Sequence, residues 1–486
     1  MNAPTLTDCI STSAYGTELR QKRAWLGLLC VYLAIVAPLY ELNESDLFSL
    51  KGIIMKKATL LLALSTFVSL YSCGSKAADS STGDTKSSVT EEVSTENTSA
   101  EAETTIAAPK DYVHGEDGYF NLLEQFPEIE LKEQIGGTCW LYSAANSMET
   151  NYVMKNGSYI TIDPMELLDR IYLDEKEEGF FVKEGEVARD IGGWQWMVTE
   201  TLSNGFGDLT LDSSVILDTA DREAIKENLR TRGSVSIGVN DTNDKYHGFH
   251  GSYFTLNYSD KDFDHAITIV GYDDHFPKEY FNLPAAEDGA WITYNSQLGS
   301  SRCEYVSYCA PIEYAISHSV TDKYSAVIGY DAGNEQDKYI KTGDFTKVAN
   351  VFHNAGKLAA VGTYNDFGEQ DIKIEVYDSS FTNLLYLQDA VLDYHGYHTV
   401  VLDTPVDVTD CAVAITYSKG APVEGETIDT DMGSYKTSIE TDQSYVFISC
   451  IDDQISDWKD LSSSGVKQFL NIDFEPGNCC IKALYQ

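Results

Sequence analysis

Hydrophobic and polar positions follow different patterns in successive parts of the chain. From residue 74 to about 110 most positions are Ser, Thr, Ala or Glu, and large apolar residues are almost absent. Such a stretch cannot bury enough surface to offset the entropy of ordering it, so we predict a disordered tether over residues 74–110. Helix-like and strand-like patterns are mixed from residue 111 to about 320, which predicts an α+β domain.

After residue 325 the chain consists of short runs in which apolar and polar positions alternate, with turn residues between the runs. Residues 372–376 (Ile-Lys-Ile-Glu-Val) and 411–417 (Cys-Ala-Val-Ala-Ile-Thr-Tyr) are two examples. A period of two with regular turns predicts an all-β sandwich over residues 325–486. The length of 486 residues also exceeds one compact core, so we expect two folded domains.

Two apolar segments stand near the N-terminus. The first, residues 24–40, is short for a membrane-spanning helix. The second follows Met55 and two lysines, and ends just before Cys73. A charged start, an apolar run and small residues before a cleavage site predict a signal peptide over residues 55–73.

The residues around Cys73 resemble a bacterial lipobox, although Tyr71 stands where that motif prefers a smaller residue. The resemblance implies a lipidated Cys73 that anchors the chain at the extracellular face of a bacterial cell membrane. We expect Met55 to be the true start, with residues 1–54 a misassigned N-terminal extension. The alternative is a membrane hairpin that keeps both apolar segments.

Composition excludes some partners but identifies no substrate. Hydrophobic residues make up 43% and charged residues 23% of the chain, as in ordinary globular proteins. The formal net charge of −42 would repel a phosphate backbone, so we expect no nucleic acid partner. Acidic charge of this kind favours solubility outside the cytoplasm.

The segment around Cys139 is the most informative in the chain. Gly136 and Gly137 precede the cysteine, and a helical apolar face follows it. That face has the spacing i, i+4, i+7 and i+11: Leu141, Ala145, Met148 and Tyr152. Cys139 is thus expected at a helix N-terminus, where free N–H groups and the helix dipole lower the pKa of a thiol. The alternative is a buried structural cysteine.

A histidine and an asparagine stand at the ends of two predicted strands. His265 begins an apolar, β-branched run, and Asn295 ends the run that starts at Ala290. An asparagine beside an imidazole can fix the orientation and tautomer of the ring. Taken alone, His265 could equally be a core residue with satisfied hydrogen bonds.

Together these segments resemble the papain family of cysteine peptidases, over residues 111 to about 314. The resemblance depends on Gln-x4-Cys-Trp from Gln134, Asp-His-Ala with an apolar strand at His265, and Trp-Ile-x-x-Asn-Ser ending past Asn295. Cys139 and His265 are 126 positions apart, just under the ~130–150 residues typical of the family. The resemblance implies an α+β, two-lobed, papain-like fold.

The family likeness also implies roles. Cys139 would attack the scissile carbonyl as a thiolate paired with protonated His265, and Asn295 would orient His265. Gln134 and the backbone N–H of Cys139 would form the oxyanion hole. Gly192 and Gly193 stand where the family binds substrate in an extended pose. No cofactor and no metal are implied.

Three departures from the family pattern are visible. Gln297 and Leu298 stand where the family has Trp-Gly, and Gly299 comes one place late. In the family, the tryptophan of this pair shields the Asn–His hydrogen bond. No cysteine lies in the three positions before Cys139 or between it and Cys303. The sequence before residue 111 has no helical pattern of an inhibitory propeptide.

The C-terminal part resembles the lectin-like domain found behind papain-type peptidases of anaerobic bacteria and archaea. The matching phrases are Ala349–Phe352, Leu358–Gly362, Gln443–Tyr445 and Cys480–Ala483, with Trp458. The resemblance implies sugar binding, and the alternative is a β-sandwich that only braces the peptidase.

Six cysteines lie past residue 300 and could form disulfides outside the cytoplasm. We expect Cys303 to pair with Cys309 and Cys411 with Cys450. A metal site is the rival interpretation, but no Cys-x-x-Cys pair supports it. His247 and His250 lie in a Gly- and Tyr-rich stretch, which predicts a loop rather than a zinc site.

The function predicted from the sequence is hydrolysis of peptide bonds in a peptide or protein substrate, with a possible glycan bound by the C-terminal domain. One alternative is a surface carbohydrate-binding adhesin whose peptidase domain is inactive. Another is an acyl-transfer enzyme such as a transglutaminase-like or cell-wall amidase fold. Those enzymes usually use Asp or His as the third catalytic residue, so Asn295 favours the peptidase.

Overall fold

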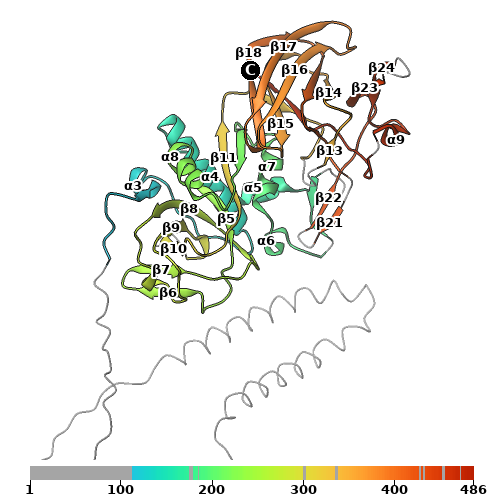
Figure 1. The fold of residues 1–486 in the computed structure, drawn as a ribbon. Coiled ribbons are helices and arrows are strands. Elements are labelled where there is room, and N and C mark those ends of the chain that lie inside the picture. Colours follow the sequence, from blue (N-terminus) through green and yellow to red (C-terminus); the bar gives the residue numbers. More distant parts are fainter. Residues whose placement is uncertain are drawn as a thin grey trace, which may run out of the picture. The chain divides into compact units, whose positions relative to one another are not determined.

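The computed structural model describes residues 112–486 except 174–178, 184, 299–302, 334–337, 426–427, 431–432, 451–454 and 471. The predicted signal peptide, the tether and Cys73 lie outside the described residues. The first half of the described chain combines helices with strands, and the second half is almost entirely strands (Figure 1). The helices are α3 (Leu122–Gln125), α4 (Cys139–Asn156), α5 (Pro164–Ile171), α6 (Ala188–Ile191), α7 (Gln195–Leu202), α8 (Arg222–Thr231) and α9 (Val466–Leu470).

A 13-stranded sheet runs through both halves of the chain. From the C-terminal half it takes β12 (Ala326–Ile328), β25 (Ile481–Tyr485), β15 (Gly356–Asn365) and β18 (His395–Val408). It continues through β4 (Thr210–Ile216), β11 (Glu313–Thr321), β5 (Val235–Val239), β8 (His265–Asp273), β9 (Ala290–Tyr294), β10 (Cys303–Ser307), β7 (Tyr253–Leu256) and β6 (His247–His250). Strand β1 (Tyr119–Asn121) pairs with β8.

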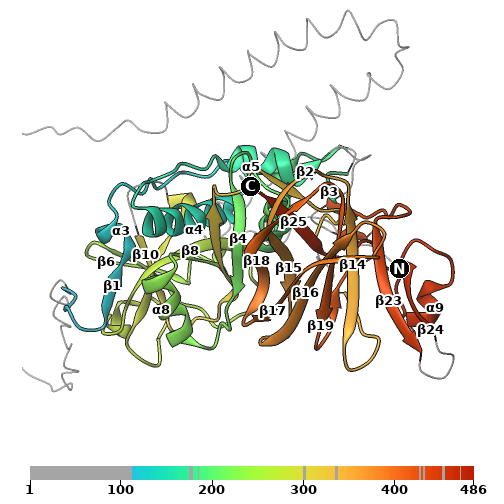
Figure 2. The same cartoon turned by 90° about the horizontal axis from the view of Figure 1, so that it is seen from above.

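Helices α4 and α8 cover opposite faces of strands β5 and β8 (Figure 2). The α8 face is apolar, because Ile225 and Leu229 of the helix pack with alternate residues of β5. The α4 face is polar: Ser143 of the helix bonds Ser236 of β5 at 2.6 Å and accepts from Thr268 of β8 at 3.0 Å. Buried hydroxyls that bond one another fix the position of α4 on the sheet better than apolar contacts alone, since hydrogen bonds are directional.

The C-terminal half is a β-sandwich. Its second sheet contains six strands in the order β17 (Leu384–Leu392), β16 (Gln370–Asp378), β19 (Cys411–Tyr417), β14 (Thr346–Phe352), β23 (Ser444–Cys450) and β24 (Ile455–Asp460). One hydrophobic core fills the space between this sheet and strands β15, β18 and β25. The run at residues 372–376 follows its pattern at Ile372, Ile374 and Val376, which are buried, and at Lys373, which is exposed. Glu375 departs from it, because this side chain is buried and pairs with Lys347 at 2.6 Å. The predicted α+β fold followed by a β-sandwich is therefore confirmed.

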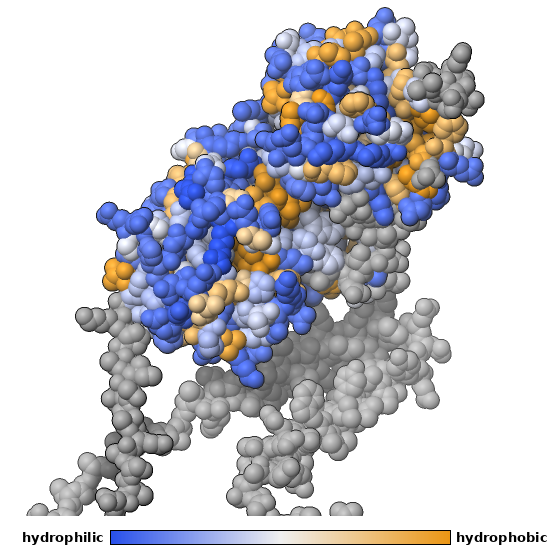
Figure 3. Space-filling view, in the orientation of Figure 1, coloured by the Kyte–Doolittle hydropathy of each residue, from blue (hydrophilic) through white to orange (hydrophobic). Residues whose placement is uncertain are grey.

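Two small sheets complete the structure. One joins β2 (Tyr172–Leu173) and β3 (Gly179–Phe181) to β22 (Gly433–Lys436) and β21 (Ile428–Thr430), and the other pairs β13 (Tyr339–Ile340) with β20 (Ala421–Pro422). Short 3₁₀ turns occur at η2 (Lys278–Tyr280) and η3 (Ser296–Leu298). The face drawn in Figure 3 is largely hydrophilic, as the acidic composition leads one to expect. Among the described residues, no helix combines the length and apolar character that crossing a membrane requires.

The predicted disulfides are wrong. Cys303, Cys309 and Cys411 are free thiols. The chain is extended along strand β10 from Cys303 onward. The Cα atoms of Cys303 and Cys309 are therefore farther apart than the ~7 Å that a disulfide tolerates. Cys411 lies beside Phe352 at one end of β14, whereas the pairing of β14 with β23 carries Cys450 past the other end.

Candidate active site

Cys139 is the first residue of helix α4, as its sequence pattern predicts. The preceding turn depends on Gly136, whose φ is 72° and whose position leaves no space for a side chain: a Cβ there would lie 2.5 Å from the carbonyl oxygen of Arg189. The N–H of Gly137 donates to that same carbonyl at 2.7 Å. The two glycines thus let the loop before Cys139 lie directly against the chain at Arg189.

His265 begins strand β8 and lies against the start of α4. The backbone N–H of Ala266 donates to Sγ of Cys139 at 3.4 Å, and the imidazole of His265 hydrogen bonds the same sulfur. His265 is 7% exposed. The polar contacts between α4 and strands β5 and β8 therefore hold thiol and imidazole together.

Asn295 follows strand β9, the antiparallel neighbour of β8. Its Oδ1 lies 2.9 Å from Nε2 of His265 and also accepts from the backbone N–H of Gln297 at 3.1 Å. Nδ1, the other nitrogen of the His265 ring, is therefore the one left to hydrogen bond Cys139. The structure thus brings Cys139, His265 and Asn295 together, although 126 and 30 positions separate them in the sequence.

The pKa values of the thiol and the imidazole move in opposite directions. Burial raises the pKa of Cys139, but the hydrogen bond and charge of His265 and the N–H groups of Ala266 and Trp140 lower it below its usual value. Burial lowers the pKa of His265, yet the hydrogen bond and charge of Cys139, with Asp241 and Asn295, raise it to about 9. Both shifts therefore favour the thiolate and imidazolium forms of the pair over the neutral forms.

Gln134 lies beside the Cys139 loop and is tied to the residue after Asn295. Its Oε1 accepts from Oγ of Ser296 at 2.7 Å, and its backbone N–H donates to the carbonyl of Ser296 at 3.1 Å. Its amide Nε2 donates to the carbonyl of Gly136 at 2.9 Å. The amide donor is thus turned toward its own loop here, and the oxyanion role of Gln134 stays a prediction.

Gly192 and Gly193 lie next to the Cys139 loop. The carbonyl of Gly192 accepts from the hydroxyl of Tyr172 at 2.9 Å. Gly193 lies on the buried ring of Trp140, because a Cβ there would be 2.4 Å from Cε2 of that ring. The glycine pair thus runs past the residue that follows Cys139, and its role in binding substrate stays a prediction.

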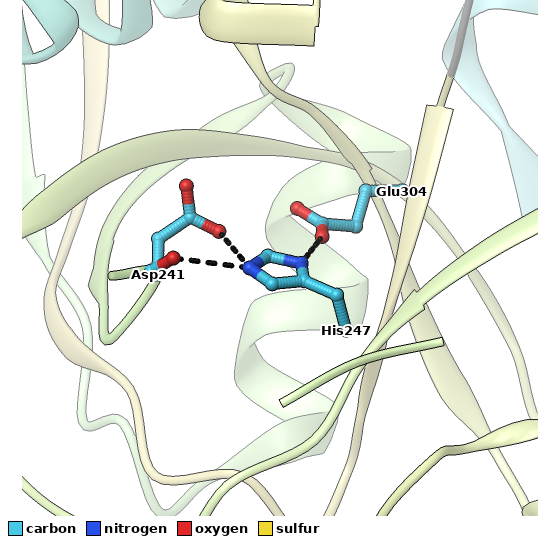
Figure 4. Close-up of side chains that lie close together, drawn as sticks. All are labelled: Asp241, His247 and Glu304. Carbon is cyan, nitrogen blue, oxygen red and sulfur yellow. Dashed lines mark hydrogen bonds and ion pairs between the residues drawn. The ribbon is translucent and has the colours of Figure 1, made fainter. Parts of the chain in front are cut away.

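Three residues whose contacts the sequence did not predict lie behind His265. His247 lies between Asp241 and Glu304, with one ring nitrogen toward each carboxylate (Figure 4). The prediction of a loop at His247 is wrong, because residues His247–His250 form strand β6, paired with β7. The pattern of polar residues among aromatics in this stretch resembles a loop, and no motif links positions 241, 247 and 304.

Comparison with known proteins agrees with this fold. Residues 330–485 match the family model described as a lectin-like domain. The cysteine protease and lectin-like domains of Cwp84, a surface layer associated protein of Clostridium difficile, superpose with a TM-score of 0.59 at 16% identity. That alignment covers 76% of this chain and 88% of the other. A second structure, clostridial cysteine protease Cwp84 after propeptide cleavage, gives the same score over 75% of this chain and 98% of that one.

Two curated relatives match about a third of the chain each. Cathepsin F of Drosophila melanogaster is 27% identical over 176 residues, which are 33% of this chain and 27% of cathepsin F. Cathepsin S of Rattus norvegicus is 22% identical over 210 residues, 36% of this chain and 58% of cathepsin S. The chain thus spans less than two thirds of either relative. The resemblance predicted from the sequence is confirmed: the fold is that of a papain-like peptidase followed by a lectin-like domain.

Proposed function

We propose that this chain is a cysteine protease that hydrolyses peptide bonds with Cys139 as nucleophile and His265 as acid and base. The observation that supports it most is the buried contact of the two side chains, with the pKa of the thiol lowered and that of the imidazole raised to about 9. Perturbed pKa values of this kind cluster at functional sites.

In the proposed reaction, the Cys139 thiolate attacks the carbonyl carbon of the scissile bond and forms a tetrahedral intermediate. The N–H of Cys139, one of the four at a helix start without an intrahelical acceptor, and the amide of Gln134 would stabilise the oxyanion. His265 gives its proton to the leaving amine. It then takes a proton from water, which attacks the acyl-enzyme and releases the acid and the thiolate.

Each supporting residue has a defined part in this proposal. Asn295 accepts from Nε2 of His265 at 2.9 Å and so leaves Nδ1 for the thiol. Gly192 and Gly193 would pair with an extended substrate backbone. For Gln134, a turn of its side chain away from the carbonyl of Gly136 would present the amide to the oxyanion.

We further propose that the enzyme acts at a bacterial cell surface. Cwp84, whose fold this chain shares, is described as surface layer associated. A lipid on Cys73 would provide the anchor, and the domain that matches the lectin-like family would bind a glycan close to the protein substrate. The adhesin with an inactive peptidase domain remains the alternative, and the paired Cys139 and His265 argue against it.

The test is labelling of the purified full-length chain, in detergent, with a thiol-directed epoxide inhibitor of papain-type enzymes, followed by peptide mapping. We expect fast labelling of Cys139 at pH 7 and its loss in Cys139→Ala and His265→Ala. Cys303 is an internal control, because burial raises the pKa of its thiol to about 11. Labelling of Cys139 no faster than a free thiol would remove the peptidase proposal and direct attention to glycan binding.

A further inference from the structure

The three residues behind His265 close a ring of side chains with His265 and Asn295. Nδ2 of Asn295 donates to Oε2 of Glu304 at 3.2 Å, and Oε1 of Glu304 lies 3.3 Å from Nδ1 of His247. Nε2 of His247 lies 3.3 Å from Oδ1 of Asp241, whose Oδ2 lies 3.9 Å from Nε2 of His265. Asn295, Glu304, His247 and Asp241 therefore each contact two neighbours in the ring, and Asn295 and Asp241 contact His265.

Every member of the ring is held by the fold around it. The backbone N–H of Asp241 donates to Asp264 at 2.8 Å, and the carbonyl of Asp241 lies 3.0 Å from Nε2 of His247. The imidazole of His247 stacks on Phe254, with ring centroids 5.3 Å apart. Glu304 is fully buried on strand β10. Such a constrained arrangement has one geometry, so it can fix the groups at its edge.

The charges in the ring balance only if His247 is protonated. The hydrogen bond and charge of Glu304, with Asp241, raise the pKa of His247 to about 9 against the lowering effect of burial. Burial and the charge of Glu304 raise the pKa of Asp241, and the charges of His265 and His247 oppose this. The imidazole of His247 therefore lies between two carboxylates, and its positive charge favours the ionised form of Asp241 in a buried place.

The geometry favours a proton-linked cluster over a metal site. Ligand atoms of Asp241, His247 and Glu304 do lie within 4.8 Å of one another. A metal takes one nitrogen of a histidine, however, and here the two carboxylates lie off opposite nitrogens of the ring (Figure 4). A single ion could not replace both contacts.

The ring also compensates for the missing tryptophan, one of the departures from the family pattern. The family shields the Asn–His hydrogen bond with a tryptophan, and this chain has Gln297 and Leu298 there. In the structure the amide of Asn295 is held from behind by Glu304 instead. A carboxylate can fix the amide orientation directly, because it accepts from Nδ2 and so leaves Oδ1 toward His265.

We propose that His247, held between Asp241 and Glu304, is a positioning residue that fixes Asn295 and His265 and stabilises the active imidazolium. The inference rests on the proposed function, since it concerns the same thiolate–imidazolium pair. Glu304 fixes the asparagine, and Asp241 places a negative charge against Nε2 of His265. His247 holds both carboxylates in place and neutralises their repulsion.

The test is the pH dependence of epoxide inactivation of the full-length chain, compared between wild type, His247→Gln and Asp241→Asn. Inactivation needs both thiolate and imidazolium, so wild type should give a bell-shaped profile with its upper limb near pH 9. Asp241→Asn removes the charge that faces His265, and His247→Gln leaves two buried carboxylates of which one binds a proton. Both should move the upper limb down by about one pH unit and lower the maximum about tenfold.

His250→Gln is the matched control, because His250 lies on the same strand β6 and contacts Tyr280 rather than the ring of side chains. It should follow the wild-type profile, and circular dichroism should show that all variants are folded. If the wild-type chain is labelled slowly at every pH, both the proposed function and this inference are wrong.

If both variants reproduce the bell-shaped pH profile of the wild type, this inference is wrong while the proposed function stands. The reason is that substitutions in a merely structural cluster do not move the upper limb of the profile. The inference also falls if the wild-type chain binds Zn²⁺ stoichiometrically by calorimetry and His247→Gln does not, since the cluster is then a metal site.

Discussion

At the scale of single residues, the proposed chemistry depends on where two protons reside. Cys139 has a lowered pKa because His265 is charged beside it, and the pKa of His265 is raised because the thiolate, Asp241 and Asn295 lie around it. Neither shift follows from the residue's own position alone. A helix N-terminus without the imidazole would leave only the smaller effect of the dipole on the thiol.

We predict a bell-shaped pH profile of kcat/KM for a peptide substrate. The folded pKa of His265 is raised from 6.5 to about 9, so the imidazolium is present below this value and is lost as pH rises through it. The thiolate forms as pH rises through the lowered pKa of Cys139. The falling limb should therefore lie near pH 9, measured in steady-state assays. A rate that keeps rising above pH 9 would contradict this assignment.

At the scale of elements, the site is an arrangement of one helix start against the ends of two strands. Helix α4 presents Cys139, strand β8 begins with His265, and Asn295 follows β9. The loop at Gly192–Gly193 approaches the same point because Trp140, the second residue of α4, offers its ring to Gly193. Close packing at Trp140 thus sets the distance between Cys139 and the glycine loop.

Gly193→Ala should disturb this packing. The added Cβ would lie 2.4 Å from Cε2 of the buried Trp140, so the loop or the ring must move. We expect kcat/KM to fall about 10- to 100-fold, the scale of a small misplacement of reacting groups. Gly343→Ala is the control, since a Cβ there meets nothing within 4 Å. Unchanged kcat/KM in Gly193→Ala would show that the loop does not depend on this contact.

At the scale of the whole molecule, the lectin-like part completes the peptidase part rather than following it as a separate unit. Strand β18 pairs with β4 over residues His395–His398, and β22 pairs with β3. The hydroxyl of Tyr364 donates to Ser203 at 2.8 Å across the same junction. Removing either part would therefore expose unpaired strand edges of the other.

Lys482→Met should weaken this junction. Nζ of Lys482 is buried and lies 2.6 Å from Oδ2 of Asp331 and 3.0 Å from Oδ1 of Asn204, just after α7. Its loss leaves a buried carboxylate without a partner, so the free energy of unfolding in denaturant should fall by about 3–5 kcal/mol.

Lys459→Met is the matched control, because Lys459 contacts the exposed Asp457 at 2.9 Å. Equal stability of Lys482→Met and Lys459→Met would mean that the buried pair does not hold the two parts together.

The sequence by itself determined the local elements and the fold class. Helical spacing after Cys139 predicted the start of α4, and alternation predicted the buried apolar residues of β16. Three motifs predicted the papain-like fold, and separate phrases past residue 349 predicted the lectin-like domain. These properties depend on neighbours in the chain, so local patterns record them. The family likeness also named Cys139, His265 and Asn295 as candidates, and the structure places Cys139 and Asn295 each in contact with His265.

Only the tertiary structure decided the contacts between distant positions. Asp241, His247 and Glu304 come from a loop and two strands, and nothing local marks them as partners. The registers of β14, β19 and β23 likewise separated Cys411 from Cys450, and no spacing in the sequence records such a register. The shared sheet of the two parts arises in the same way. Strand pairing and buried charge depend on which surfaces meet after folding, and that choice is made by the whole core.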